Sequence, residues 1–230
     1  MPRVTPAGAL TRWTGWDVRG GASADPTAAL AFTHSAPRDR SRGDHYELLA
    51  VAGRGFRPPT LLSTVGLAGG GAPDPGPGGE PDREGLRQVW SLLYQRITET
   101  GPPVVDPYAI YLLGVNPPVD ATDDDLEVFN DFYTNVHLPE VAQRRRALRA
   151  LRYELVSEIR APYRGAPRFL AVYEVDEESA SNRRHAGPAY SSGPEVWQRH
   201  TTPWRLWFRR LAPDDGGAAR TSPVADPPTD

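Results

Sequence analysis

Apolar and polar residues alternate along several short segments of this chain, and most of these segments end at glycine or proline. A period of two residues is typical of β-strands with one buried face, because successive side chains point to opposite sides of a strand. We therefore predict strands over Leu10–Val18, Tyr46–Ala52, Thr60–Leu67, Tyr108–Val115, Leu151–Ile159, Arg168–Val175 and Trp204–Leu211.

Helical spacing of apolar residues is clearest in Arg83–Thr98, and Gly101-Pro102-Pro103 would end a helix there. We therefore predict a helix over this segment. A short, irregular helical region is expected from Ser179 to Arg199. The apolar residues that would share one face of the first helix are Leu86, Val89, Trp90, Leu93 and Ile97.

A further helix is predicted to begin after Thr122. The Thr122 side chain can cap it, with Asp125 at the third helical position and acidic residues in the first turn, where the helix dipole favours negative charge. The pattern runs to about Leu138, with a bent continuation to Ala147.

Titratable residues follow the apolar strip of this helix. Tyr133 and His137 are four residues apart and Glu140 follows three residues later, so the three side chains can converge on one patch. Pro139 lacks an N–H and is expected to push Leu138 out of the α region. A titratable cluster beside a helix break indicates a pocket wall rather than plain surface. The apolar strip itself consists of Leu126, Phe129, Tyr133 and Val136.

Composition limits the possible classes of protein. The chain has 230 residues, enough for one large domain or two small ones. Its 22 glycines and 25 prolines gather partly in Ala68–Asp82 and Ala212–Asp230, which we expect to be a flexible loop and a disordered tail. Because there is no cysteine, disulfides, thiolate metal sites and thiol nucleophiles are excluded.

Charge and hydropathy favour a cytoplasmic protein. The formal net charge of −3 gives no attraction toward nucleic acid. No apolar stretch approaches the roughly 18 residues that a membrane helix needs. Met1–Leu10 lacks the basic and apolar regions of a secretion signal. We therefore expect neither nucleic acid nor a membrane as a partner.

The two halves of the chain share short identities. Tyr46-Glu47-Leu48 corresponds to Tyr153-Glu154-Leu155, and Val89-Trp90 corresponds to Val196-Trp197, both at a spacing of 107 residues. Such short matches arise by chance, but their common spacing favours a tandem duplication.

Residues 108–211 resemble EthD-like members of the dimeric α/β-barrel superfamily. The motif that carries the resemblance is Phe129-Asn-Asp-Phe-Tyr-Thr-Asn-Val-His-Leu-Pro-Glu-Val141, followed by the strand that contains Arg152-Tyr-Glu-Leu. The family has an aromatic–acid–aromatic run that leads to His-x-Pro-Glu on its first helix. The sequence departs from the family after this helix, where Arg144–Arg149 replaces the usual Pro-Gly-Phe turn.

The resemblance implies an α+β fold: tandem ferredoxin-like repeats (βαββαβ) whose antiparallel sheets pair into an α/β barrel. We expect a degenerate N-terminal repeat over 1–105, a C-terminal repeat over 106–211 and a tail over 212–230. Ala28–Pro37 stands where His-x-Pro-Glu would be in the first half, so that site is expected to be lost. Only one strand fits between Thr98 and Asp120, so the first half is also expected to lack its last strand.

The resemblance places ligands between the sheet and the helices, in an apolar cleft. His137 is the candidate general acid/base, since its unperturbed pKa lies near 6.5; alternatively it caps the bent helix or bonds a free carbonyl. Tyr133 is a candidate hydrogen-bond donor to an oxyanion, or a core residue with its hydroxyl at the rim. Glu140 is a candidate to orient His137 or to act as a base, or else a plain surface partner of His137.

Candidate substrate-binding residues are aromatic or amide side chains, as expected for a planar aromatic or polyketide-like substrate. Alternation puts Tyr153 and Glu154 on opposite faces of their strand, and the sequence leaves open which face is inside. His185–Tyr190 is either a plain loop or a lid. The candidate residues are Asn130, Phe129, Tyr153, Tyr173 and Trp207.

We expect no metal and no cofactor, because no two histidines fall at ligand spacing on one element. Haem occurs in some members of the superfamily, but one candidate axial histidine is weak evidence for it. Arg144–Arg146 with Arg149 and Arg152 form a basic patch. A solvated helix face is the plain interpretation, and an anionic substrate tail or an acyl-carrier partner is the alternative.

Two functional hypotheses follow. The first is a cofactor-independent enzyme of bacterial specialised metabolism that catalyses an acid/base-assisted cyclisation or isomerisation of an aromatic or polyketide-like molecule; a cofactor-free monooxygenase on a phenol is its variant. The second is a non-catalytic binding or assembly protein. The second predicts that His137 is fully bonded to backbone, and the first that it lines a cavity. A homodimer or an intrachain pseudo-dimer would cover the sheet.

Overall fold

The computed structural model describes residues 9–18, 44–51, 58–67, 86–104, 106–160, 165–182 and 190–211. Most of the described chain is β-strand. The strands are β1 (Leu10–Val18), β2 (Asp44–Val51), β3 (Leu61–Leu67), β4 (Leu86–Thr100), β5 (Ala109–Asn116), β6 (Arg149–Arg160), β7 (Phe169–Val175) and β8 (Thr201–Arg210). The helices are α2 (Asp123–Phe132), the π-helix η2 (Tyr133–His137), α3 (Leu138–Arg144), α4 (Glu177–Ser181) and α5 (Glu195–Gln198).

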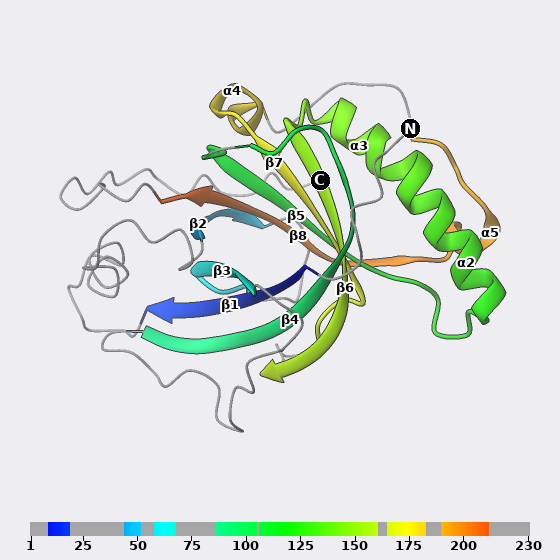
Figure 1. The fold of residues 1–230 in the computed structure, drawn as a ribbon, viewed down its shortest axis with the longest axis horizontal. Helices are drawn as coiled ribbons and strands as arrows, with labels where there is room; N and C mark the ends of the chain where they lie inside the picture. Colours follow the sequence, from blue (N-terminus) through cyan, green and yellow to red (C-terminus); the bar gives the residue numbers. More distant parts are fainter. Residues whose placement is uncertain are drawn as a thin grey trace.

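The strands form one closed antiparallel barrel in the order β1-β3-β2-β8-β5-β7-β6-β4, with β4 pairing back to β1 (Figure 1). Closure removes the unpaired edges that an open sheet would expose. An eight-stranded barrel has an interior just wide enough to be filled by side chains. The protein therefore has an α+β fold with a closed antiparallel barrel, and both features agree with the sequence prediction. Each of the predicted strands is present, with ends shifted by at most a few residues.

The helix predicted over Arg83–Thr98 is wrong, because this segment is the long strand β4. Gln88 is only 1% exposed, although helical spacing would place it away from the apolar face. Residues 90–94 are all buried, so both faces of the strand are covered. A strand buried on both faces loses its alternation, and its apolar residues then also satisfy a helical period.

The order of strands is the same in the two halves of the barrel. The first half runs β4-β1-β3-β2 and the second runs β8-β5-β7-β6, so the last strand of each half borders the first. β4 thus occupies the position of the last strand in the first half. The expectation that this half lacks a last strand is wrong, and it followed from assigning β4 as a helix.

Buried residues form two main layers, one inside the barrel and one outside it. Inside, the rings of Trp90 on β4 and Trp204 on β8 stack with centroids 4.5 Å apart and an interplanar angle of 8°. These strands are four places apart in the barrel order, so the contact crosses the interior. The Val89-Trp90 match to Val196-Trp197 is therefore misaligned, because Trp90 lies on a strand and Trp197 on α5.

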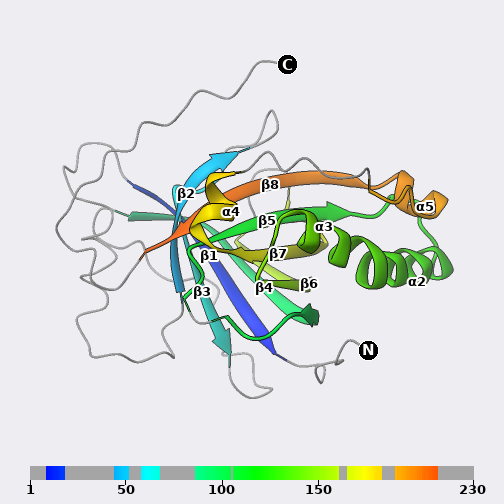
Figure 2. The same ribbon diagram turned by 90° about the horizontal axis from the view of Figure 1, so that it is seen from above.

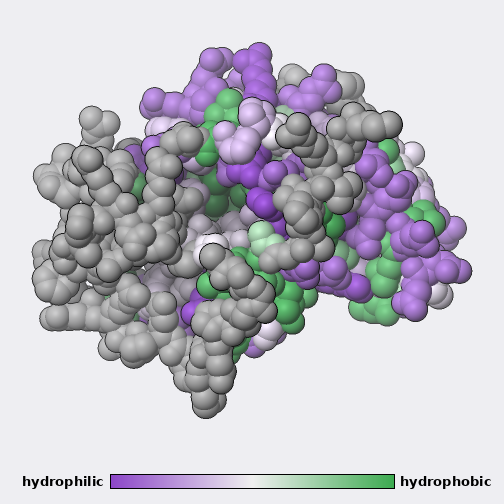
Figure 3. Space-filling model, viewed as in Figure 1, coloured by the Kyte–Doolittle hydropathy of each residue, from purple (hydrophilic) through white to green (hydrophobic). Residues whose placement is uncertain are grey.

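The outer layer lies between the second-half strands and helices α2, η2 and α3 (Figure 2). Hydrophilic residues predominate on the exposed side of α2, with some hydrophobic residues among them (Figure 3). Among the described helices, none is long and apolar enough to cross a membrane. Three segments discussed in the sequence analysis, Ala28–Pro37, Ala68–Asp82 and Ala212–Asp230, lie outside the described residues.

The start of α2 has the predicted capping box. The Asp125 N–H donates to Thr122 Oγ1 at 3.2 Å, and the Thr122 N–H donates to Asp125 Oδ2 at 3.0 Å. Two backbone donors that lack intrahelical partners are thereby satisfied. The cap fixes where the helix begins over the sheet.

Thr122→Ala is expected to lower the free energy of unfolding by about 1 kcal/mol, because it removes the cap acceptor. Urea denaturation of the variant and the wild type measures this difference. Val128→Ala is the matched control, since Val128 lies on the same helix, is 49% exposed and makes no cap. Equal stabilities of Thr122→Ala and wild type would contradict the role of the cap.

Pro139 does not break the helix, contrary to prediction. Leu138 keeps helical angles, φ −59° and ψ −47°, and its N–H donates to the Tyr133 carbonyl five residues back. This π turn contains one extra residue, which widens the backbone next to the proline that cannot donate. The helix therefore continues through η2 into α3, and His137 stays on its buried side.

Candidate functional site

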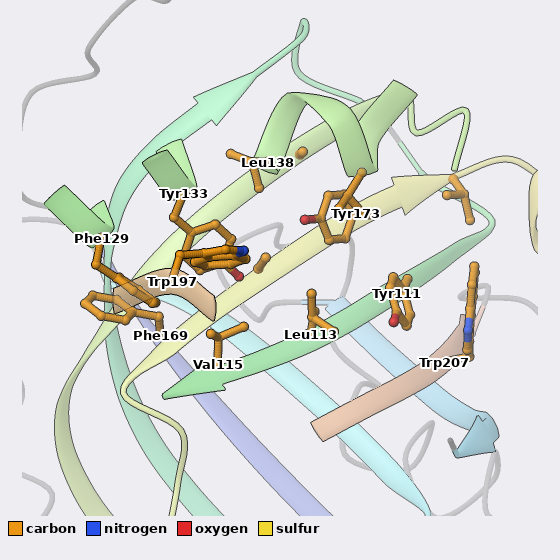
Figure 4. Close-up of a cluster of buried hydrophobic side chains, with 14 of the residues drawn as sticks. Tyr111, Leu113, Val115, Phe129, Tyr133, Leu138, Phe169, Tyr173, Trp197 and Trp207 are labelled. Carbon is orange, nitrogen blue, oxygen red and sulfur yellow. The ribbon is translucent and has the colours of Figure 1, made fainter. Parts of the chain in front are cut away.

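The candidate site lies in the outer layer, between the helices and the outer faces of β5, β7 and β8. Tyr133 and Leu138 descend from the helical side, and Tyr173, Leu113 and Val115 rise from the strands toward them (Figure 4). β7 presents Tyr173 on this face because alternate residues point outward from the barrel. The layer is rich in aromatic side chains, as the sequence predicts.

Trp197 is the centre of the aromatic contacts in this layer. It comes from the short helix α5, which precedes β8, and it is buried. Its ring centroid lies 4.5 Å from that of His137, 5.0 Å from that of Tyr133 and 4.2 Å from that of His200. The four-residue helix α5 thus holds together the residues that η2 contributes.

His137 is buried, with 8% of its surface exposed, and is surrounded by aromatic rings. Burial, together with a smaller contribution from the neighbouring His200, lowers its pKa to about 4, and the charge of Glu140 opposes this shift. The imidazole is therefore neutral at pH 7. Among the described residues, His137 Nδ1 has no hydrogen-bond partner. Within the described residues, the backbone hydrogen bond that the non-catalytic hypothesis predicts for this histidine is therefore not present at Nδ1.

Two tyrosine hydroxyls in the same layer are also buried without a partner in the described chain, Tyr133 Oη and Tyr173 Oη. Burial raises the pKa of both phenols. Tyr111, on β5, lies beside Tyr173 with ring centroids 5.9 Å apart. Burial also raises the pKa of Tyr111, and the Arg145 guanidinium opposes this shift. All these phenols are protonated at neutral pH and can donate hydrogen bonds.

Glu140 is turned toward the loop before α5. The Ser191 N–H donates to Glu140 Oε2 at 3.2 Å, and the Ser191 hydroxyl donates to Oε1. The carboxylate therefore anchors this loop, while its charge acts on His137 through space. Tyr190, next to Ser191, has its ring centroid 5.3 Å from that of His137. Residues 183–189, which include most of the suggested lid, lie outside the described chain.

The predicted substrate-binding residues divide between the two faces of the barrel wall. Phe129 packs on Trp197 and Phe169 in the outer layer, and Trp207 stacks on Tyr111 with centroids 4.7 Å apart. Tyr153 lies inside the barrel, where it contacts Trp13. β6 therefore separates Tyr153 from His137, and the two do not belong to one site.

Asn130 binds a buried arginine rather than facing an open pocket. Its side-chain oxygen and its carbonyl both accept from Arg152, the carbonyl at 3.4 Å, and Thr134 Oγ1 accepts at 2.7 Å. Arg152 is 0% exposed, and its guanidinium lies 4.3 Å from the centre of the Tyr133 ring. A solvated helix face, the plain interpretation of the basic patch, is wrong at Arg152, because this residue lies on β6, where alternation turns it outward beneath α2.

Sequence reasoning did not assign Trp197 or Tyr111 to the site, and it considered Arg145 and Arg152 only as members of a basic patch. The alternation of β5 and β6 places Tyr111 and Arg152 on the outer faces, but only the fold shows that helices cover those faces. In the described part of the chain, no group of three or more His, Asp or Glu side chains is arranged to hold a metal ion.

Tyr173→Phe is expected to stabilise the ligand-free protein by about 1–2 kcal/mol, because it removes a buried hydroxyl that has no partner among the described residues. Tyr94→Phe is the matched control. Tyr94 Oη is buried too, but it donates to the Pro167 carbonyl at 2.7 Å, so its loss is expected to destabilise by about 1 kcal/mol. Urea denaturation compares the two, and changes of the same sign would contradict the assignment of Tyr173 Oη as unpaired.

Comparison with known proteins gives only distant similarity. No family model and no curated protein matches this sequence. A heme-binding protein from Thermus thermophilus shares 11% identity at a TM-score of 0.49, over 93% of this chain and 96% of that one. A protein provisionally described as a chlorite dismutase shares 10% identity at a TM-score of 0.47, over 90% of this chain and 96% of that one. A major regulator of staphylococcal pathogenesis shares 10% identity at a TM-score of 0.39, over 88% of this chain and 99% of that one. All these TM-scores lie below 0.5, so nothing about this chain's activity follows from them.

Proposed function

We propose that the barrel consists of two ferredoxin-like repeats, over 1–105 and 106–211, that arose by duplication and pair as in the dimeric α/β-barrel superfamily. The shared strand order of the halves supports this. So does a repeated packing arrangement. A Cβ on Gly15 would meet Pro59 at 2.8 Å and Trp90 at 3.1 Å, and one on Gly114 would meet Pro167 at 2.6 Å and Trp204 at 3.0 Å. In each half, a glycine on the first strand contacts a proline just before the third strand and a tryptophan on the fourth strand.

In this proposal one chain supplies both sheets, so a monomer is already a closed pseudo-dimer and no second copy is needed to cover the sheet. The EthD-like motif in α2 and η2 gives the second repeat its site. The first repeat lacks that motif, as its sequence predicts.

We propose that the outer layer binds a planar aromatic or polyketide-like small molecule and promotes proton transfer on it without a cofactor. One observation carries the proposal: Tyr133 Oη, Tyr173 Oη and His137 Nδ1 are buried in one aromatic layer and have no partner among the described residues. Each such group costs about 1–3 kcal/mol when left unpaired. A ligand with oxygen atoms at these positions would recover that energy, and aromatic walls suit a flat ring system.

The three groups also define a reaction class. Neutral His137 is able to accept a proton from an acidic carbon next to a carbonyl, and a tyrosine hydroxyl donates a hydrogen bond to the oxygen that becomes an enolate. The enolate would then favour the protonated imidazole, since an opposite charge nearby raises a histidine pKa. Return of that proton to another carbon, or attack of the enolate carbon on a second carbonyl, gives isomerisation or cyclisation.

Deuterium exchange tests this without knowledge of the natural substrate. 2-Tetralone, a flat aromatic ketone with an acidic benzylic carbon, is incubated in D2O with the wild type and His137→Gln, and exchange is followed by NMR. We expect the wild type to exchange the benzylic protons of 2-tetralone at least roughly 10²-fold faster than His137→Gln does, because this is the usual contribution of one placed base. Tyr153→Phe, inside the barrel, is the matched control and should exchange like the wild type.

Each other outcome has a defined meaning. Binding of the ketone without exchange would make the protein a binding module. Turnover of a phenol that depends on O2 would favour the cofactor-free monooxygenase. A haemin titration serves as a further control, because neutral imidazole is a common iron ligand; a Soret shift that is lost in His137→Gln would replace the proposal by haem binding. No binding at all would overturn it.

A further inference from the structure

Residues 190–194, called the strap from here on, lie over His137 and lead into α5. No residue of the strap belongs to a helix or a strand. The ring centroid of Tyr190 is 5.3 Å from that of His137. Tyr190 is 37% exposed, whereas His137 is 8% exposed. Tyr190 therefore separates part of the buried imidazole from solvent.

The first half of the strap is tied to α3. The Ser191 N–H donates to Glu140 Oε2 at 3.2 Å, and the Ser191 hydroxyl donates to Glu140 Oε1. The Arg144 guanidinium lies 4.5 Å from the centre of the Tyr190 ring. The carboxylate makes both hydrogen bonds charge-assisted, but they are exposed to water, which keeps their net contribution small. Such a tie holds a segment in place and still breaks readily.

Gly193 seats the other end of the strap on the aromatic layer. Its φ is +70°, and a Cβ there would lie 2.6 Å from both Phe132 Cε1 and Trp197 Cδ1. Glycine alone fits this contact and this backbone angle without strain. The Gln198 side-chain N–H also donates to the Gly193 carbonyl at 3.0 Å. The strap is thus packed against the layer at Gly193 and hydrogen-bonded only at the surface at Ser191.

We propose that the strap is the entrance to the outer layer, that it swings about Gly193, and that Glu140 holds it closed over His137 through Ser191. This inference rests on the proposed function, because it concerns entry of the ligand to the same site. Exposed segments without regular structure open at low cost in free energy, and active-site lids are drawn from such segments. Glu140 is then a positioning residue that acts on His137 through the strap.

Labelling of His137 by diethyl pyrocarbonate measures how often the imidazole is uncovered, and it needs no substrate. At pH 7.5 His137 is neutral whether its pKa is about 4 or near 6.5, so the rate reports access alone. Mass spectrometry of the labelled peptide gives this rate. We expect Glu140→Ala to label at His137 at least about tenfold faster than the wild type, because its strap opens without breaking the hydrogen bonds to Ser191.

Two carboxylate variants serve as controls for Glu140→Ala. Glu140→Gln keeps an acceptor oxygen for Ser191, and its labelling rate should stay within about threefold of the wild-type rate. Glu178→Ala removes a carboxylate of α4 that pairs with Arg146 at 3.1 Å, away from the strap. It should label like the wild type.

Gly193→Ala opens the strap without a change of charge. Its Cβ would collide with Phe132 and Trp197, so we expect labelling of His137 to be faster by about the same factor as in Glu140→Ala. Gly165→Ala is the matched control, since Gly165 has a similar φ of +79° but its Cβ would meet only Glu158 Oε1 at 3.6 Å. Circular dichroism checks that both variants fold, and the Glu140 series stands if Gly193→Ala does not.

The pKa of His137 separates a closing role of Glu140 from a purely electrostatic one. The charge of Glu140 raises this pKa, so loss of the charge alone would lower it further. Opening of the strap admits water and moves the pKa up toward 6.5. The other titratable side chains that face His137, on His200, Tyr133 and Tyr190, are unchanged. We therefore expect NMR titration to give a higher pKa in Glu140→Ala than in the wild type.

Either of two results would overturn the strap as an entrance: labelling of Glu140→Ala at the wild-type rate, or a lowered pKa of His137 in this variant. Residues 190–194 would then be a fixed wall of the layer. Because labelling and titration use no substrate, they are independent of the exchange of 2-tetralone. A strap that opens in a protein that neither binds nor exchanges 2-tetralone would overturn the proposed function and not the motion.

Discussion

Lowering the pH from 6.5 to 4 is expected to cost this protein about 3 kcal/mol of unfolding free energy through His137. The folded protein lowers the pKa of His137 to about 4, whereas the unfolded chain has the ordinary value near 6.5. The unfolded state therefore binds the proton first. Stability from this group is fully present above pH 6.5 and is lost as the pH falls toward 4.

Urea denaturation at pH 7, 6, 5 and 4 measures the effect, with His137→Gln as the comparison. Between pH 7 and pH 4, the free energy of unfolding of the wild type should fall by about 3 kcal/mol more than that of His137→Gln. Asp125 and Asp176 have lowered pKa values because Thr122 and Ser179 hydrogen-bond to them. The stability that these two carboxylates contribute is lost as the pH falls below about 3.8, which is outside the range from pH 7 to pH 4. Parallel curves for wild type and variant would show that His137 titrates normally and is not buried as described.

Gly114→Ala is expected to destabilise the barrel by about 2–3 kcal/mol, the range for overpacking a rigid contact. A Cβ at this position would lie 2.6 Å from Pro167 and 3.0 Å from the Trp204 Cβ, and neither a proline ring nor a Cβ atom can swing aside. The strands β5, β7 and β8 would have to separate to admit it.

Gly66→Ala is the control, because a Cβ on this exposed glycine of β3 meets nothing within 4 Å. It should leave stability unchanged or raise it slightly, since alanine loses less backbone entropy on folding. Gly15→Ala should resemble Gly114→Ala, as a Cβ there meets Pro59 at 2.8 Å. A Gly114→Ala variant as stable as Gly66→Ala would contradict the described packing of the barrel.

The strands of this fold are largely predictable from sequence, because alternation and turn residues are local signals. β4 is the exception. Its segment is covered on both faces, so Gln88 and Leu92 are buried where a helix would expose them. That burial depends on β1 and β6, which come from distant parts of the sequence. No pattern within β4 reveals these partners.

The arrangement of the candidate site was predictable from sequence only for residues that lie on one element. Tyr133 and His137 are neighbours on one helix, and their spacing predicts that they meet. Trp197 joins them from α5, and Arg152 from β6, which are contacts between segments remote in sequence. Tyr153 was misplaced because the sequence does not tell which strand face is inside.

The most direct test of the account is the NMR titration of His137, assigned by its loss in His137→Gln. The account predicts an apparent pKa well below 6.5 in the free protein, and a shift of this resonance when 2-tetralone is added. A resonance that titrates near 6.5 and ignores the ligand would place His137 in solvent, and the outer layer would then be only a hydrophobic core.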